Sequence, residues 1–243
     1  METNVAPVLP EEKTMGGFSK ILNIFFEPRK VFESLKTKPT WLVSFIIIVL
    51  ISVVSMYLTY PFIMSDTIAK IRANEKIPDE QKETIVAQLQ ETTSPQLRGV
   101  VFSVIFILLI LLIISGLLFF TFNVMLGGDS SFKRVLSVFS YSALVNIPAA
   151  IVKIPLIFTK KTVEIQTSLA LFLSPDSKET FIYRFLSFFD IFYIWMIILV
   201  SLGLSVMYNF TIKKSTSTVF ILWICLALVV SVLSGLLRRI IGF

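Results

Sequence analysis

The sequence contains no histidine, a single cysteine and few charged residues, with Lys, Arg, Asp and Glu together making up 16% of 243 residues. The absence of histidine excludes His-based acid–base catalysis, Ser-His-Asp triads and zinc sites that need His ligands. The lone Cys225 excludes an intrachain disulfide. We therefore expect a protein that is not an enzyme, with no catalytic residues, no cofactor and no metal site.

Apolar side chains are abundant instead: 55% of the residues are hydrophobic and 23 are Phe, and the mean hydropathy is +0.84. A helix that crosses a bilayer needs about 20 apolar residues in a row. Runs with at most one charged residue predict five such helices, at about 41–63, 99–126, 135–158, 185–212 and 215–237. The runs do not alternate as barrel strands would. The predicted fold class is all-α, an integral membrane five-helix bundle within residues 41–243.

The segments outside the spans differ in character. Residues 1–17 are acidic, contain proline and lack periodicity, so we expect a disordered tail. In residues 18–40 apolar side chains recur at helical spacing on both sides of Glu27-Pro28, which predicts an amphipathic segment lying in the membrane interface. A further amphipathic helix is expected between residues 65 and 95, and residues 163–173 are apolar but too short to span.

The distribution of Lys and Arg sets the expected orientation. The totals on the two sides are nearly equal, but short loops carry the topological signal. The two short loops contain Lys133-Arg134 and Lys213-Lys214, and both lie on the N-terminal side. We therefore expect a cytoplasmic N-terminus. The net charge of +6 is explained by attraction to anionic headgroups, so no nucleic-acid partner is implied.

Two charged residues fall inside predicted spans and need an explanation, because a charge in the bilayer is costly. Lys153 lies five residues before the end of the third run, and Asp190 lies five residues after the start of the fourth. Both would then sit about 7–8 Å deep, so the two side chains can face each other. The equally weighted alternative is that Lys153 reaches the outer headgroups through its long side chain.

Small and polar residues recur at helical spacing in the last three spans. Such stripes are typical of close helix packing, and a substrate path is the lesser alternative. The positions are Ser137, Tyr141 and Pro148; Ser201, Ser205 and Asn209; and Ala227, Ser231 and Gly235. Gly127-Gly128 lacks the remainder of a phosphate-binding motif, so we interpret it as a turn between spans.

Several further motifs follow one another along the chain. They are Phe26-Glu27-Pro28-Arg29-Lys30-Val31-Phe32, the Gly127-Gly128 turn with Phe132-Lys133-Arg134, Tyr141-Ser142 with Ile147-Pro148, and Asp190-Ile191-Phe192 with Trp195 and Gly203. Taken in this order, they resemble the Yip (Ypt-interacting protein) domain family of multi-pass membrane proteins in its bacterial branch. The resemblance implies a five-helix membrane bundle with a cytoplasmic N-terminus, here in the bacterial cytoplasmic membrane. It implies no catalytic residues and no cofactor.

Eukaryotic members of that family are linked to small GTPases and vesicle traffic. The acidic Asp-Leu-Tyr-Gly-Pro segment of many of those members is not found here, and Ser140 stands where they often carry glycine. Small-GTPase binding is therefore not carried over. The expected partners are the lipid bilayer and other membrane proteins or further copies of the chain.

Three functional hypotheses follow. The first is a non-enzymatic scaffold or accessory subunit that organises a membrane or a membrane complex. The second is a small permease or transporter subunit with a polar path, whose lining would be Lys153, Asp190, Ser201, Ser205 and Asn209. A membrane enzyme ranks third, because Asp129 and Asp190 are isolated acids. A wet cavity in the middle of the membrane would favour the second hypothesis over the first.

Overall fold

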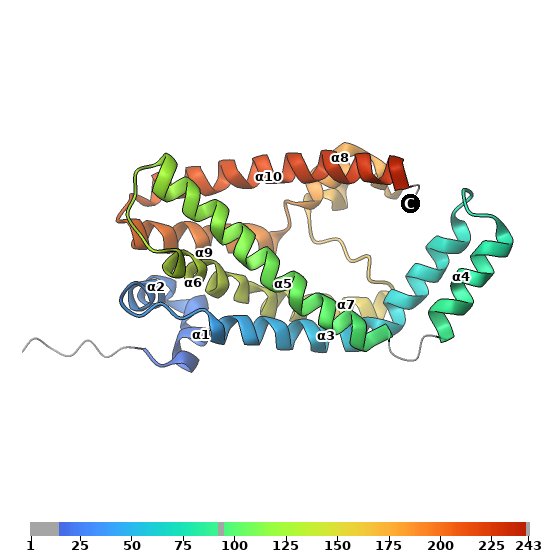
Figure 1. Ribbon diagram of the computed structural model, residues 1–243, viewed down its shortest axis with the longest axis horizontal. Helices are drawn as coiled ribbons and strands as arrows, with labels where there is room; N and C mark the ends of the chain where they lie inside the picture. Colours follow the sequence, from blue (N-terminus) through green and yellow to red (C-terminus); the bar gives the residue numbers. More distant parts are fainter. Residues whose placement is uncertain (1–14, 92–94, 242–243) are drawn as a thin grey trace, which may run out of the picture.

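The computed structural model describes residues 15–91 and 95–241. The described part is helical, with no β-strand, and five of its helices are long and apolar enough to cross a membrane. These long helices run along the long axis of the molecule (Figure 1). The predicted all-α, five-span fold class is confirmed. Most of the predicted tail lies in residues 1–14, outside the described residues.

The chain begins with two short helices and the first spanning helix. These are α1 (Gly17–Phe26), α2 (Pro28–Thr37) and α3 (Leu42–Ala73). Pro28 opens α2 because its ring fixes φ and its missing N–H is not needed in the first helical turn. The third helix continues ten residues beyond the predicted end at residue 63. It changes direction along its length (Figure 1), and Pro61, which cannot donate an N–H to the preceding turn, explains the bend.

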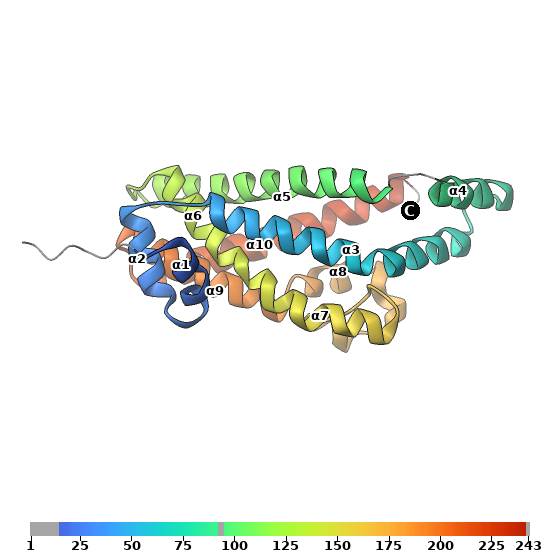
Figure 2. The ribbon, with the colours of Figure 1, turned by 90° about the horizontal axis from the view of Figure 1, so that it is seen from below.

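The middle of the chain forms a short helix that packs against the end of α3, followed by two further spans. The helices are α4 (Asp79–Glu91), α5 (Pro95–Phe120), α6 (Phe132–Ser142) and α7 (Asn146–Lys160). A π-helical turn, Thr121–Met125, ends α5, and the second span covers Gly99–Met125. A 3₁₀ turn, Ala143–Val145, joins α6 to α7, so the third span is Phe132–Lys160. The α4 helix, predicted from its amphipathic pattern, projects from one end of the bundle beside the end of α3 (Figures 1 and 2).

The last helices are α8 (Phe181–Ser187), α9 (Ile191–Tyr208) and α10 (Ile212–Ile241). The predicted fourth span, 185–212, is wrong at both ends. It begins at Ile191 because Phe189 and Asp190 are extended and pair with residues 167–169. It ends at Tyr208 because Asn209 adopts a left-handed conformation with φ 53°. The separate helix α8 packs against α10 instead of extending α9.

The core of the bundle is centred on α6. All residues from Val135 to Val145 are buried, and α6 contacts α2, α3, α5 and α9. In α2 the apolar face of Val31, Phe32 and Leu35 is fully buried against this core. Within residues 18–40 the apolar side chains therefore lie on two helices, and the apolar face of α2 is buried against the bundle. Of these two helices, α1 keeps an exposed apolar face, with Phe18, Leu22 and Phe26, because it covers the bundle with one side.

Candidate functional site

Several residues of the motifs named above, Phe32, Gly203 and Tyr141 among them, lie at the end of the bundle that carries α1 and α2. Phe32 of α2 packs against Gly203 of α9 and Val138 of α6. A Cβ atom on Gly203 would come within 2.5 Å of Val138 Cγ1 and 3.0 Å of the Phe32 ring. Gly203 is therefore a packing residue that allows α2, α6 and α9 to approach closely.

Tyr141 and its neighbours bind the start of α3. Tyr141 is fully buried, and its hydroxyl lies 3.4 Å from Thr40 Oγ1. Ser140 Oγ donates to the Trp41 carbonyl at 3.1 Å and lies 2.5 Å from Ser44 Oγ. The Ser140 hydroxyl thus joins α6 to the start of α3, and this bond could not be inferred without the neighbouring helix.

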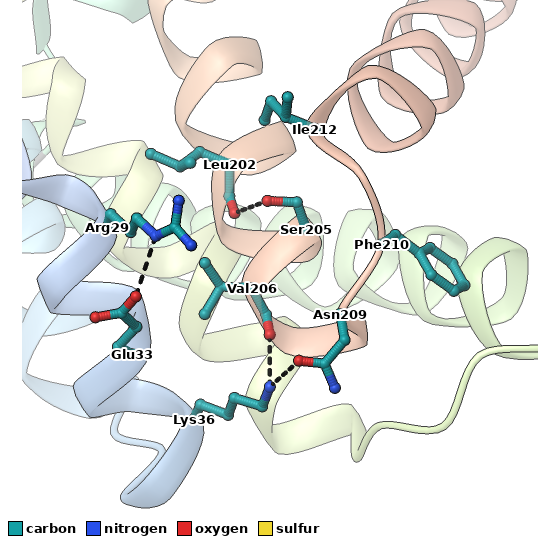
Figure 3. A pocket seen from close by; sticks show the side chains of 9 residues that line it. All are labelled: Arg29, Glu33, Lys36, Leu202, Ser205, Val206, Asn209, Phe210 and Ile212. Carbon is teal, nitrogen blue, oxygen red and sulfur yellow. Dashed lines mark hydrogen bonds and ion pairs between the residues drawn. The ribbon is translucent and has the colours of Figure 1, made fainter.

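Lys36 ties α2 to the end of α9. Its Nζ donates to the Val206 carbonyl at 2.8 Å and to Asn209 Oδ1 at 2.6 Å, as Figure 3 shows. Arg134 Nε, from the first turn of α6, donates to the Lys36 carbonyl at 2.9 Å. Lys36 and Arg134 therefore donate to backbone carbonyls at the C-terminal ends of α9 and α2. The last carbonyls of a helix have no partner within the helix, so such donors stabilise its end.

The glycine turn is held by a second polar cluster. Tyr208 donates from its hydroxyl to Asn123 Oδ1, and Asn123 Nδ2 donates to the Ser130 carbonyl at 2.9 Å. Gly127 has φ +65°, a conformation that glycine adopts without penalty. A Cβ on Gly128 would lie 2.5 Å from Tyr208 Cδ1. The structure shows Gly127-Gly128 as a turn packed against the end of α9.

An open cavity of about 440 Å³ lies beside this cluster (Figure 3). Its polar lining comes from α2 and from the end of α9, and its apolar lining comes from α9 and the α9–α10 turn. The lining residues are Arg29, Glu33, Lys36, Leu202, Ser205, Val206, Asn209, Phe210 and Ile212. Arg29 Nε donates to Glu33 Oε1 at 3.1 Å, and the two other guanidinium nitrogens point toward the cavity. The cavity combines cationic groups with an apolar wall.

Lys153 and Asp190 lie together away from this end. Lys153 Nζ donates to Asp190 Oδ2 at 2.9 Å. Asp190 does not lie inside a helix, as the depth argument assumed, but caps α9 by accepting the Phe192 N–H at 2.8 Å. Thr167 adds a third donor. The carboxylate, 7% exposed, therefore has three donors, from α7, from the segment before α8 and from α9.

Of the other predicted polar positions, the two serines of α9 bond within their own helix, whereas the buried Ser231 Oγ of α10 has no hydrogen-bond partner among the described residues. Ser201 Oγ donates to the Ile197 carbonyl and Ser205 Oγ donates to the Leu202 carbonyl, both within α9. Pro148 lies in the first turn of α7, just after the 3₁₀ turn. Proline has no N–H to donate to the preceding turn, so the hydrogen-bond pattern of α6 does not continue through it. Trp195 packs edge-on against Phe25 of α1, with ring centroids 5.8 Å apart.

A charged cluster at the opposite end was missed in the sequence. Glu164 accepts from Lys178 and from Lys70, the latter at 2.9 Å, and these bonds lower the pKa of Glu164 to about 2. Asp66 Oδ2 accepts from Thr162 Oγ1 at 2.8 Å and from the Val163 N–H at 2.9 Å. Both acids tether the segment after α7 to the end of α3, a pairing across about a hundred residues that local patterns do not reveal.

Within residues 15–91 and 95–241, no group of three or more His, Cys, Asp or Glu side chains could hold a metal ion. The second cavity, of about 420 Å³, lies near α8 and α10 and includes Glu164, Lys178 and Arg184. Neither this cavity nor the one beside α2 is lined by Lys153 or Asp190.

Comparison with known proteins gives one match. No curated protein and no solved structure matches the chain. The family model described as the Yip1 domain matches residues 22–233, which include α2, the first four spanning helices, most of the fifth and the motifs described above. The chain is a multi-pass membrane protein that belongs to the Yip1 domain family.

Proposed function

We propose that this protein is a non-enzymatic scaffold or accessory subunit that organises a membrane or a complex of membrane proteins. The observation that carries the proposal is how the polar groups of the spanning helices are used. Asp190 is surrounded by three donors and holds α7, α9 and residue 167 together. A carboxylate bonded in this way stabilises one arrangement of helices and has little capacity left for a substrate.

The same reasoning weighs against the permease alternative. Its path would need free polar groups along α9, but Ser201 and Ser205 donate to carbonyls of their own helix. Asn209 accepts from Lys36 at the end of the helix. The two cavities described above lie near the ends of the spanning helices and contain neither Lys153 nor Asp190. These contacts support a bundle whose polar residues hold helices in place.

We further propose that the N-terminal end faces the cytoplasm of a bacterial cell, and that the chain belongs to the bacterial branch of the family. Short basic loops support this orientation, since Lys133 and Arg134 begin α6 and Lys213 and Lys214 begin α10 at the same end. We do not propose small-GTPase binding, because the acidic segment associated with it is missing from the sequence. The proposed partners are other membrane proteins or further copies of the chain.

Complementation of a strain that lacks the gene tests this proposal. The double variant Lys153→Met with Asp190→Asn removes both charges but keeps an oxygen that can accept the Phe192 N–H. If the protein is a scaffold, the double variant should restore the wild-type phenotype when immunoblots show that the membrane contains a normal amount of the variant protein. Loss of complementation at normal abundance would support the transport alternative. Lys160→Met, an exposed change at the end of the same helix, is the matched control.

A further inference from the structure

We propose that the cavity between α2 and the α9–α10 turn binds the phosphate of an anionic phospholipid. Its lining supplies two cations from α2. Arg29 directs two guanidinium nitrogens toward the cavity (Figure 3), and Lys36 lies at its edge, bonded to Asn209. A planar guanidinium with free N–H donors matches the oxygens of a phosphate.

The one acid in the lining orients Arg29. Glu33 accepts from Arg29 Nε at 3.1 Å, one turn along α2, so the nitrogens at the other side of the guanidinium are directed away from it. The lining keeps a net positive charge from Arg29, Lys36 and Glu33 together. Lys214, in the first turn of α10, does not line the cavity but brings a third cation close to it, since its Nζ lies 3.7 Å from the ring centroid of Phe210, which does line it.

The cavity lies at the level where a bilayer places its headgroups. It is found where α9 ends, at Tyr208, and α10 begins, at Ile212, so it marks one limit of two spanning helices. The neighbouring helix α1 exposes Phe18, Leu22 and Phe26 at intervals of four residues, with exposed fractions of 75%, 50% and 81%. Such a stripe is typical of a helix lying in the membrane interface.

An apolar track favours a lipid over a free phosphate. Leu202, Val206 and Ile212 form the apolar wall of the cavity. From Leu202 the same face of α9 continues through Ile198 and Ile194, which are 56% and 39% exposed. Residues spaced by four lie above one another on a helix, so this track leads from the cavity toward the middle of the membrane. An acyl chain can follow it while the phosphate stays near Arg29.

Native mass spectrometry of the full chain, released from detergent with added lipid, tests the proposal. The probes are phosphatidylglycerol, diacylglycerol without a phosphate, and soluble glycerol 3-phosphate. We expect phosphatidylglycerol to bind best. Arg29→Gln should weaken its binding at least about tenfold, which corresponds to about 1.4 kcal/mol, because the variant loses charged hydrogen bonds to the phosphate.

Two further variants separate this site from general attraction to basic surfaces. Lys30→Gln removes the adjacent charge on α2, which pairs with Glu27 and does not line the cavity, so binding should be unchanged. Ser205→Leu fills the cavity and should weaken binding while Arg29 is intact. Equal losses for Arg29→Gln and Lys30→Gln would overturn the proposal, as would equal binding of diacylglycerol. Equal binding of glycerol 3-phosphate would overturn the assignment to a lipid.

Discussion

Replacing Lys153 with methionine should destabilise the protein by leaving the buried Asp190 carboxylate without its charged partner. Methionine is unbranched and of similar length, so the change removes the charge with little change in packing. The two atoms that lose contact, Lys153 Nζ and Asp190 Oδ2, lie 2.9 Å apart. The carboxylate would remain at the start of α9 with Thr167 and the Phe192 N–H as its donors.

The size of the effect follows from the exposure of the two side chains. Removing one partner of a fully buried ion pair costs about 3–5 kcal/mol. Here the Asp190 side chain is 7% exposed, but the Lys153 side chain is 33% exposed. Because solvent screens the lysine in part and two donors remain, we expect a loss of about 2–3 kcal/mol for Lys153→Met. Asp190→Asn should cost about 1–2 kcal/mol, since Lys153 can then turn toward water.

A double-mutant cycle on the free energy of unfolding in detergent micelles measures the coupling. The double variant should lose about 1–2 kcal/mol less than the sum of the single variants. The Lys160→Met control should change stability by no more than about 0.5 kcal/mol, because Lys160 is exposed. Additive single effects would refute the reasoning, since they would show that Lys153 and Asp190 do not interact in the folded protein.

Three further predictions concern other parts of the bundle. Gly203→Ala should destabilise by about 1–3 kcal/mol through overpacking, whereas Gly116→Ala, whose new Cβ would meet no atom within 4 Å apart from its chain neighbours and the adjacent helix backbone, should be neutral or slightly stabilising in thermal unfolding. The pKa of Glu164 falls from 4.5 to about 2 on folding, so its contribution to stability is complete above pH 4.5 and is lost between about pH 4.5 and 2. In Glu164→Gln this part of the pH dependence should disappear from acid unfolding curves, and an unchanged curve would contradict the assignment. In a cysteine-free background, an impermeant thiol reagent should label Glu75→Cys from outside intact cells and Asp129→Cys only after the membrane is opened; the reverse pattern would invert the topology.

The spanning helices could be predicted because the bilayer imposes a length and an apolar composition that a single sequence shows directly. The ends were less predictable. The start of α9 depends on Asp190 capping the helix while residues 189–191 pair with residues 167–169, and that partner segment lies about twenty residues earlier in the chain. The prediction that Lys153 and Asp190 face each other rested on matched depths. The structure brings the two side chains together by a different arrangement, with Asp190 at a helix end.

The polar clusters at the two ends could not be predicted, for a related reason. Lys36 and Asn209 are separated by 173 positions, and Tyr208 and Asn123 by 85. In the sequence Lys36 is one basic residue among several, and its neighbours in the sequence do not indicate that it, and not another, donates to a carbonyl of α9. The glycine pattern was more informative: Gly127, Gly128 and Gly203 were singled out, and each occupies a turn or a close approach.

The central claim is that the polar residues of the spanning helices hold the helices together and line no water-filled path between them. The accessibility of position 201 to water tests this claim most directly. Ser201 is fully buried in the middle of α9, at the position where a polar path would pass. In native membranes, with Cys225 replaced by serine, the account predicts that Ser201→Cys does not react with a small water-soluble thiol reagent, whereas the exposed Asp129→Cys does. Reaction of Ser201→Cys at a rate similar to that of Asp129→Cys would contradict the account and establish a water-filled path through the bundle.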